Sequence, residues 1–185
     1  MIEQTLVLIK PDGVQRSLVG RIITKFEDTG LKLIGIKMVL LSKEDAAKHY
    51  TNDLIPVLGG KTKKDWDKAK IKYSETEEEI GRMVISGLRD FISSAPVIAI
   101  AVEGVHAVEN VRKIIGATGP RDAAPGTIRG DFAHLGLGYA STKKVAARNI
   151  IHASGSNEEA RREMKLYFKE KELYAYKTVH DEHVL

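Results

Sequence analysis

Apolar residues follow two kinds of spacing along the chain. Residues 5–9, Thr-Leu-Val-Leu-Ile, are typical of a buried strand, and the continuous apolar run at 96–102 is typical of a strand that is buried on both faces. Apolar residues three or four positions apart are typical of helices that bury one face, and they recur from Leu18 to Phe26. The whole pattern predicts strands at 5–9, 31–41, 96–102 and 149–153, the last a short inner strand, and helices around 18–26, 42–50, 85–91, 108–115 and 157–168.

Local signals mark where several of these elements begin and end. Lys10-Pro-Asp-Gly13 ends the first strand, because proline lacks a backbone donor and Pro-Asp-Gly favours a turn. Ser42 and Ser156 each precede an acidic residue by three positions, which is a capping signal for the start of a helix. Lys10 is therefore expected at the end of a buried strand, and the helix after Ser42 is expected to carry His49.

The predicted order of elements is β-α-β-α-α-β-α-β-α. If one helix is a peripheral addition, this order is close to the βαββαβ arrangement of ferredoxin-like folds. We therefore predict an α+β fold with an antiparallel sheet and helices on one face. The chain of 185 residues is the size of one domain, so residues 1–185 are predicted to form a single domain.

Three segments fit this regular pattern poorly. Residues 51–80 contain Pro56, two adjacent glycines, a lysine-rich run and then several glutamates, which indicate a peripheral insertion. We interpret it as a solvated decoration, with a lid or an assembly contact as the alternative. Residues 116–130 are rich in Gly, Pro, Ala and Asp and predict a long ordered loop, which inside a compact domain is usually functional. Residues 169–185 form a polar C-terminal tail.

Composition narrows the class of protein. The chain is 43% hydrophobic and 29% charged, which is typical of a folded globular domain. No apolar run approaches the roughly 20 residues that cross a bilayer, so we expect a cytoplasmic protein without a membrane partner. The absence of cysteine excludes disulfides, thiolate catalysis and zinc–thiolate sites. The net charge of +4 suits an anionic partner, although a lysine-rich surface explains much of it.

Without cysteine, covalent catalysis needs another nucleophile. Among the six histidines, His152 is the strongest candidate because it ends an apolar strand directly before a capped helix. The N–H groups of that helix start favour an anion such as phosphate, and a neutral imidazole is a competent nucleophile. A core or capping histidine is the alternative at this position. We interpret the other five histidines as structural or solvated. His180 and His183 lie in the tail, His106 at a helix start, His134 in a glycine-rich loop and His49 on a surface-like helix.

Cations that could bind phosphate oxygens are present in the predicted strand end, in one helix and in the long loop. These candidates are Lys10, Arg112, Arg121 and Arg129. Gly59-Gly-Lys-Thr62 is similar to the end of a phosphate-binding loop, but that pattern needs a glycine where this chain has Ile55. No spacing indicates a metal cage built by the protein, whereas Mg²⁺ that arrives with a phosphate would leave no motif.

Four segments carry longer motifs. They are Thr5-Leu-Val-Leu-Ile-Lys-Pro-Asp-Gly-Val-Gln-Arg16, Ala117-Thr-Gly-Pro120, Pro125-Gly-Thr-Ile-Arg-Gly-Asp-Phe132 and Asn149-Ile-Ile-His-Ala-Ser154. In this order they resemble the signature segments of the nucleoside diphosphate kinase family. The resemblance covers nearly the whole chain apart from the insertion and the tail, and it implies the same ferredoxin-like fold that the element order predicts.

The resemblance also implies an activity. His152 would take the γ-phosphoryl group from a nucleoside triphosphate, typically ATP, and become a phosphohistidine. It would then pass the group to a nucleoside diphosphate in a ping-pong mechanism. The family further implies Mg²⁺ bound with the nucleotide, and a homo-oligomer that is a tetramer or hexamer built from dimers. Nucleic acid would not be required.

Supporting residues follow from the same resemblance. Lys10 would neutralise the transferring phosphate and contact the sugar, and Tyr50 would support His152 and the incoming phosphate. Glu163 would orient His152, with Ser154 bonded to Glu163. The positions that match residues gripping the distal phosphates and the ribose are Arg112, Thr118, Arg129 and Asn149.

Three features depart from the family pattern. The family usually stacks the base on a phenylalanine, and Val84 or Leu88 falls near that place. The segment between Arg129 and Asn149 is longer than the usual spacing, and Gly155 replaces an aspartate. Two alternative functions are a catalytically silent nucleotide- or nucleic-acid-binding protein on the same fold, and a scaffold whose basic insertion binds nucleic acid.

Overall fold

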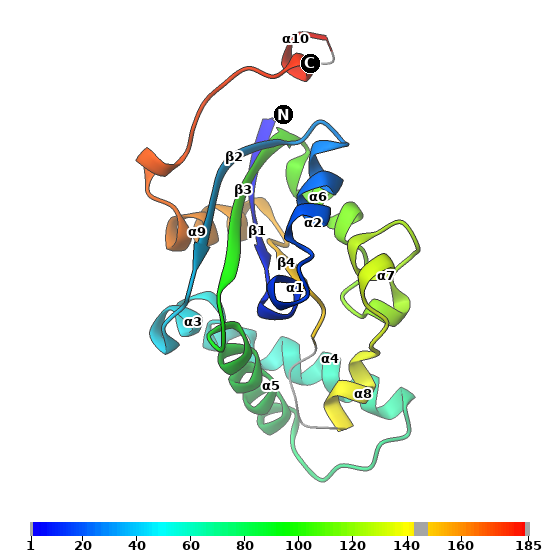
Figure 1. Cartoon of the computed structure of the whole chain (residues 1–185). Helices are drawn as coiled ribbons and strands as arrows, with labels where there is room; N and C mark the ends of the chain where they lie inside the picture. Colours follow the sequence, from blue (N-terminus) through cyan, green and yellow to red (C-terminus); the bar gives the residue numbers. More distant parts are fainter. Residues whose placement is uncertain (1, 143–147, 184–185) are drawn as a thin grey trace.

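The computed structural model describes residues 2–142 and 148–183. Within these residues, one antiparallel sheet has the strand order β2-β3-β1-β4 (Figure 1). The strands are β1 (Ile2–Ile9), β2 (Lys32–Val39), β3 (Val97–Val105) and β4 (Ile151–Ala153). Helices α2 (Val19–Glu27) and α6 (Ala107–Ile115) make the two crossovers of a βαββαβ topology, which confirms the predicted ferredoxin-like α+β fold.

The sheet is buried on both faces, because residues 6–9 of β1 and residues 97–102 of β3 are apolar and buried at every position. On β1, Val7 and Ile9 pack toward α2 and α6, whereas Leu6 and Leu8 pack into a second cluster on the opposite face. That second face is covered by α3 (Lys43–His49), α5 (Glu77–Ile92) and α9 (Asn157–Tyr167). The prediction of helices on one face is wrong, since strands that are apolar throughout leave two faces to cover.

β4 lies at an edge of the sheet, since the described residues pair it with β1 and with no other strand. The prediction of an inner strand is wrong in this respect. The register places His152 opposite Leu8, and the Lys10 backbone N–H donates to the Ile150 carbonyl at 2.7 Å. This pairing brings the first and last motif segments of the sequence together at one end of the sheet.

The C-terminal tail runs beside the opposite edge strand, β2 (Figure 1). The Tyr174 N–H donates to the Ile34 carbonyl at 2.8 Å, so the tail adds one backbone bond to this edge. Near the end of the chain, Asp181 accepts an ion pair from Lys32 at 3.1 Å. The tail therefore packs against the sheet instead of extending into solvent.

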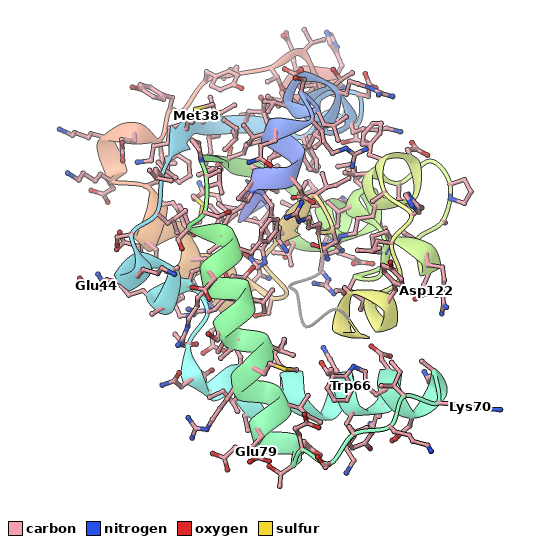
Figure 2. All side chains as sticks on the ribbon, turned by 60° about the horizontal axis from the view of Figure 1, so that its bottom comes forward. Met38, Glu44, Trp66, Lys70, Glu79 and Asp122 are labelled. Atoms are coloured by element: carbon pink, nitrogen blue, oxygen red, sulfur yellow. The ribbon has the colours of Figure 1, made fainter. Side chains whose placement is uncertain are left out.

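Most of the predicted insertion is helical. The 3-10 turn η1 (Asn52–Leu54) leads into α4 (Ile55–Lys68), which packs along α5 (Figure 2). A Cβ on Gly59 would lie 2.0 Å from the Glu77 carbonyl oxygen, and one on Gly81 would lie 2.2 Å from the Ile55 carbonyl oxygen. The adjacent glycines therefore do not break the helix; they let two helix backbones approach closely. The phosphate-loop-like motif lies inside α4, which supports its rejection.

Several short elements complete the described chain. They are α1 (Pro11–Gln15), η2 (Pro120–Asp122), α7 (Ile128–Phe132), α8 (Leu137–Thr142), η3 (Glu170–Glu172) and α10 (Val179–His183). The predicted loop at 116–130 contains η2 and the beginning of α7. Among the described residues, no helix combines the length and the apolar character needed to cross a membrane.

Replacing Gly81 by alanine is expected to lower the free energy of unfolding by about 1–3 kcal/mol, because the new methyl group would push α5 away from the Ile55 carbonyl. Gly20→Ala is the matched control, since an added Cβ there meets no atom within 4 Å. That control should gain up to about 1 kcal/mol from helix propensity. Chemical denaturation of the three proteins measures both changes, and a Gly81→Ala protein as stable as wild type would contradict the close helix approach.

Candidate active site

A cavity of about 490 Å³ lies between the ends of β1 and β4 and the helices α4, α5 and α8 (Figure 2). This volume is in the range of small-molecule sites. Most residues predicted for the site line it: Lys10, Tyr50, Val84, Leu88, Arg112, Thr118, Arg129, Asn149 and His152. Arg121 does not line it; its exposed side chain pairs with Asp122 at 3.3 Å.

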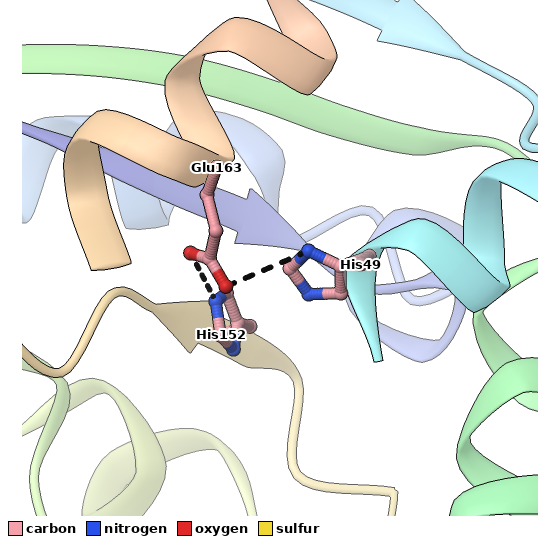
Figure 3. Close-up of side chains that lie close together, drawn as sticks. All are labelled: His49, His152 and Glu163. Atoms are coloured by element: carbon pink, nitrogen blue, oxygen red, sulfur yellow. Dashed lines mark hydrogen bonds and ion pairs between the residues drawn. The ribbon is translucent and has the colours of Figure 1, made fainter. Parts of the chain in front are cut away.

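His152 projects from β4 toward Glu163 on α9 (Figure 3). The His152 Nε2 atom lies 2.9 Å from Glu163 Oε2, and the Ser154 hydroxyl donates to the same oxygen at 2.7 Å. Glu163 is 1% exposed, whereas the His152 side chain is 17% exposed and borders the cavity. A buried carboxylate therefore holds an imidazole that remains accessible.

The charge state of Glu163 determines the tautomer of His152. Burial by itself would raise the pKa of the Glu163 carboxyl, but His152, His49 and Ser154 stabilise the anion and bring that pKa down to about 2. A carboxylate can only accept a hydrogen bond, so Nε2 of the neutral imidazole carries the proton. The Nδ1 atom of His152 is left with a free lone pair, which is the requirement for a nucleophile.

Lys10 lies at the end of β1 and is 5% exposed. Its ammonium group donates to Asn149 Oδ1 at 2.8 Å, and Asn149 Nδ2 donates to the Thr118 carbonyl at 2.9 Å. Burial, together with repulsion from Arg129, lowers the pKa of Lys10 to about 7. The Asn149 side chain thus connects Lys10, at the end of β1, to the loop that contains Thr118.

Arg129 is buried beneath the same loop. Its guanidinium donates to four backbone carbonyl oxygens at 2.7 to 3.3 Å, those of Gly116, Ala117, Asn149 and Ile151. Burial and the neighbouring charge of Arg112 lower the pKa of Arg129 to about 10, so it stays cationic at neutral pH. Arg129 therefore fastens the loop to the start of β4, while the exposed Arg112 on α6 lines the adjoining wall.

Comparison with known proteins agrees with this geometry. The family model described as nucleoside diphosphate kinase matches residues 3–54 and 61–173. The nucleoside diphosphate kinase of Pyrococcus furiosus is 45% identical over 95% of this chain and 88% of its own length. That of Borreliella burgdorferi is 38% identical over 96% of this chain and 93% of its own. The chain belongs to the nucleoside diphosphate kinase family.

Solved structures of nucleoside diphosphate kinases support the same assignment. The crystal structure of an NDP kinase from Pyrobaculum aerophilum has a TM-score of 0.90 at 34% identity and covers 95% of this chain and 100% of that one. A transition-state mimic of the Borrelia burgdorferi kinase, with bound vanadate and ADP, has a TM-score of 0.79 at 37% identity, covering 97% and 95% of the two chains. The protein is therefore an enzyme of nucleotide phosphoryl transfer.

His49 lies beside His152 in this candidate site, whereas from the sequence we interpret it as a residue of a surface-like helix. It is 1% exposed, its ring centroid is 4.6 Å from that of His152, and its Nδ1 atom is 3.6 Å from Glu163 Oε1. The interpretation is wrong because α3 packs against α5 and α9 and buries Ala46 and His49. The spacing of Ala46, His49 and Tyr50 at i, i+3 and i+4 is the signal that would have placed His49 inside.

The environment of His49 keeps its ring neutral. Burial, followed by repulsion from His152, lowers the pKa of His49 to about 3, even though Glu163 acts in the opposite direction. Within the described residues neither ring nitrogen of His49 has a hydrogen-bond partner. The kinase site thus contains two imidazoles beside one carboxylate, and only His152 is hydrogen-bonded to it.

Helix α4 also contributes to the kinase site. Its residues Leu58, Lys61, Thr62 and Asp65 line the cavity, and Trp66 is buried. The interpretation of the insertion as a solvated decoration is wrong for this helix, because it packs on α5 and on α8. Apolar residues at helical spacing were the sequence signal for this buried helix. The two adjacent glycines and the lysines made the segment resemble a solvated loop instead.

The longer segment between Arg129 and Asn149 lies at the same wall. It supplies α8, from which Leu137 and Ala140 line the cavity. Residues 143–147 of this segment lie outside the described part of the chain. Helices α4 and α8 therefore meet at the side of the cavity away from β1.

Nucleotide binding is expected to raise the pKa of Lys10 from about 7, because phosphate charge stabilises the ammonium. Binding at about pH 8 should take up a proton, and the uptake should decline toward about pH 6, where Lys10 is already charged. Titration calorimetry in buffers of different ionisation enthalpy measures this uptake. Lys10→Met should abolish it, and Lys113→Met, at an exposed position on α6, should not. The absence of uptake by wild type near pH 8 would contradict the buried, partly neutral Lys10.

Proposed function

We propose that the protein transfers the γ-phosphoryl group of a nucleoside triphosphate, typically ATP, to a nucleoside diphosphate through a phosphohistidine at His152. In the first half-reaction the Nδ1 lone pair bonds to the γ-phosphorus while the bond to the β–γ bridging oxygen breaks, and the diphosphate leaves. In the second, a terminal oxygen of another diphosphate bonds to the same phosphorus while the P–N bond breaks. The two half-reactions form a ping-pong cycle at one site.

The observation that carries this proposal is the contact between Glu163 and Nε2 of His152, at 2.9 Å. The carboxylate holds the proton on Nε2 throughout, so Nδ1 can donate its electron pair without losing a proton first. When Nδ1 becomes phosphorylated, the ring gains positive charge, and the buried anion stabilises that charge. Ser154 supports the arrangement, since its hydroxyl bond to Glu163 fixes the position of the carboxylate.

The cations around the cavity suit a phosphoryl transfer whose transition state is loose and negatively charged. We assign Lys10 to the transferring phosphate, and Arg112, Arg129 and Thr118 to the distal phosphates. Asn149 is assigned to the ribose, a role it would share with positioning Lys10. Burial raises the pKa of the Tyr50 phenol, which therefore stays protonated and can donate to an incoming phosphate oxygen.

The base is proposed to rest on the apolar wall of α5. Val84 and Leu88 line the cavity there, beside Leu58 of α4. These aliphatic side chains take the place of the aromatic residue that the family usually has. They would bind a base by apolar contact without selecting one base by hydrogen bonds, which fits an enzyme acting on several nucleotides.

Mg²⁺ is proposed to enter with the nucleotide. Among the described residues that line the cavity, the carboxylates are Asp65 and Glu159, on different helices, and Glu159 already accepts from the Gly155 N–H. This donor set suits an ion held by phosphate oxygens and water better than an ion caged by the protein. Such an ion supplies charge neutralisation at the phosphates.

A homo-oligomer built from dimers is proposed from the surface of β2. Ile36 and Met38 lie on one face of this edge strand and are 52% and 60% exposed, and Leu40, directly after the strand, is 66% exposed. A row of exposed apolar side chains on an edge strand favours pairing with a second copy of the chain. Larger assemblies, tetramers or hexamers, would be built from such dimers.

Incubation with γ-labelled ATP and Mg²⁺ is expected to give an acid-labile, alkali-stable label that moves to GTP when GDP is added. His152→Ala should remove the label entirely. Glu163→Gln should slow labelling by about 10²–10⁴-fold, since it removes the charge that sets the tautomer. Wild-type protein that neither takes up label nor makes GTP would contradict the function and leave a silent nucleotide binder.

Met38→Lys is expected to reduce the mass of the protein in solution, because a charge would be buried in the proposed dimer contact. Leu166→Lys, at an exposed apolar position on α9, is the matched control and should keep the wild-type mass. Sedimentation velocity of the three proteins at equal concentration measures the difference. A wild-type chain that sediments as a monomer would refute the oligomer.

A further inference from the structure

Three side chains with metal-ligating atoms converge from three different elements. His49 of α3, His152 of β4 and Glu163 of α9 place one ligand atom each within 4.8 Å of one another (Figure 3). Two imidazole nitrogens and one carboxylate oxygen are the donor set of many zinc sites with three protein ligands. Mg²⁺ prefers oxygen ligands, so this cluster suits a different ion from the one proposed to accompany the nucleotide.

The distances suit coordination after small side-chain movements. Zinc bonds of about 2.0–2.1 Å in tetrahedral geometry place neighbouring ligand atoms about 3.3–3.4 Å apart. His49 Nδ1 and Glu163 Oε1 are 3.6 Å apart, too far for a hydrogen bond and close to that spacing. His152 Nε2 and Glu163 Oε2, at 2.9 Å, would separate slightly as two metal bonds replaced their hydrogen bond.

His49 is an independent indication of a ligand. It is 1% exposed, points toward Glu163 in Figure 3, and both of its ring nitrogens lack a hydrogen-bond partner within the described residues. Buried polar atoms of native proteins are nearly always bonded, so an unpartnered imidazole aimed at a carboxylate calls for an explanation. A metal ion between the two groups would give a partner to Nδ1 of His49 and to Oε1 of Glu163.

We propose that His49, His152 and Glu163 form an inhibitory site for Zn²⁺ or a similar transition-metal ion. When a metal binds Nε2 of His152, the proton on Nε2 leaves to water and a proton from water binds Nδ1, so the metal-bound ring is again a neutral imidazole with its one N–H at Nδ1. The lone pair that would attack phosphorus is no longer available. The inhibition rests on the proposed phosphohistidine mechanism, whereas the binding of the ion does not.

The surrounding charges determine how such an ion would behave. Arg162 lies 3.7 Å from Glu163 Oε1 and Lys10 also faces the cluster, so both cations oppose a further positive charge. The Arg162 side chain is 41% exposed and can turn outward, and His152 borders the cavity through which an ion would enter. Binding should therefore be reversible and weaker than in structural zinc sites.

Metal binding is measured first without nucleotide, by equilibrium dialysis with Zn²⁺ and by the visible absorption of Co²⁺. One ion per chain with a tetrahedral Co²⁺ spectrum is expected. His49→Phe, which keeps an aromatic ring, and His49→Gln, which keeps a polar group, should each weaken binding by at least about tenfold. The double variant His180→Ala/His183→Ala is the matched control for the histidines of α10, and it should bind as wild type does.

Inhibition is measured next, as phosphohistidine formation from excess Mg²⁺–ATP at increasing Zn²⁺. Formation should fall in proportion to occupancy of the site and return with a zinc-selective chelator. Binding that both His49 variants leave unchanged, or that the tail variant abolishes, would overturn the site. Full labelling at full occupancy would overturn the inhibition. Wild type that binds Zn²⁺ through His49 but forms no phosphohistidine without it would support the site and refute the proposed function.

Discussion

The active site depends on one buried negative charge. Glu163 is almost fully enclosed, and its carboxylate remains ionised because an imidazole and a hydroxyl bond to it. Removing either partner would leave the buried charge with one hydrogen bond fewer, which is costly inside a protein. The tautomer of His152, the neutrality of His49 and the positions of both rings all follow from where this carboxylate lies. The site is therefore organised around the Glu163 carboxylate, which accepts these hydrogen bonds but does not line the cavity.

The pairing of β1 with β4 places His152 beside that charge, which α9 supplies from its position against β1. Because β4 is short and lies at an edge, few bonds hold it, and side chains complete the attachment. Arg129 bonds to the carbonyl groups before and within β4, and Asn149 connects the strand end at Lys10 to the facing loop. The cations of the site thus have a structural role in the absence of a phosphate group. Their conformations are set before binding, which reduces the cost of ordering them around a nucleotide.

The side of the cavity away from the sheet is built differently. Close glycine contacts let α4 lie against α5, and α8 from the longer loop packs on α4. These helices provide aliphatic and polar side chains at the wall where the base is proposed to rest.

Much of the architecture was predictable from local patterns. The apolar runs predicted the strands, helical spacing predicted α2, α5, α6 and α9, and the motif segments indicated His152, Lys10 and the positions proposed to bind phosphate. These features depend on residues that are near one another in sequence, so a linear pattern contains them. The ferredoxin-like topology followed because few arrangements accommodate this order of elements.

The tertiary structure decided what depends on contacts between distant segments. His49 is buried because α9 packs against α3. Helix α4 can line the cavity because Gly81 of α5 lets the two helices approach closely. The tautomer of His152 needs a carboxylate eleven positions away to lie at hydrogen-bond distance. The spacing of residues along the chain does not predict these features, because the burial and the protonation of a side chain depend on all of its neighbours in space. Local patterns thus identify the residues that can take part in the chemistry, and the packing of α3, α4 and α9 around the sheet sets the burial and the charged neighbours of each.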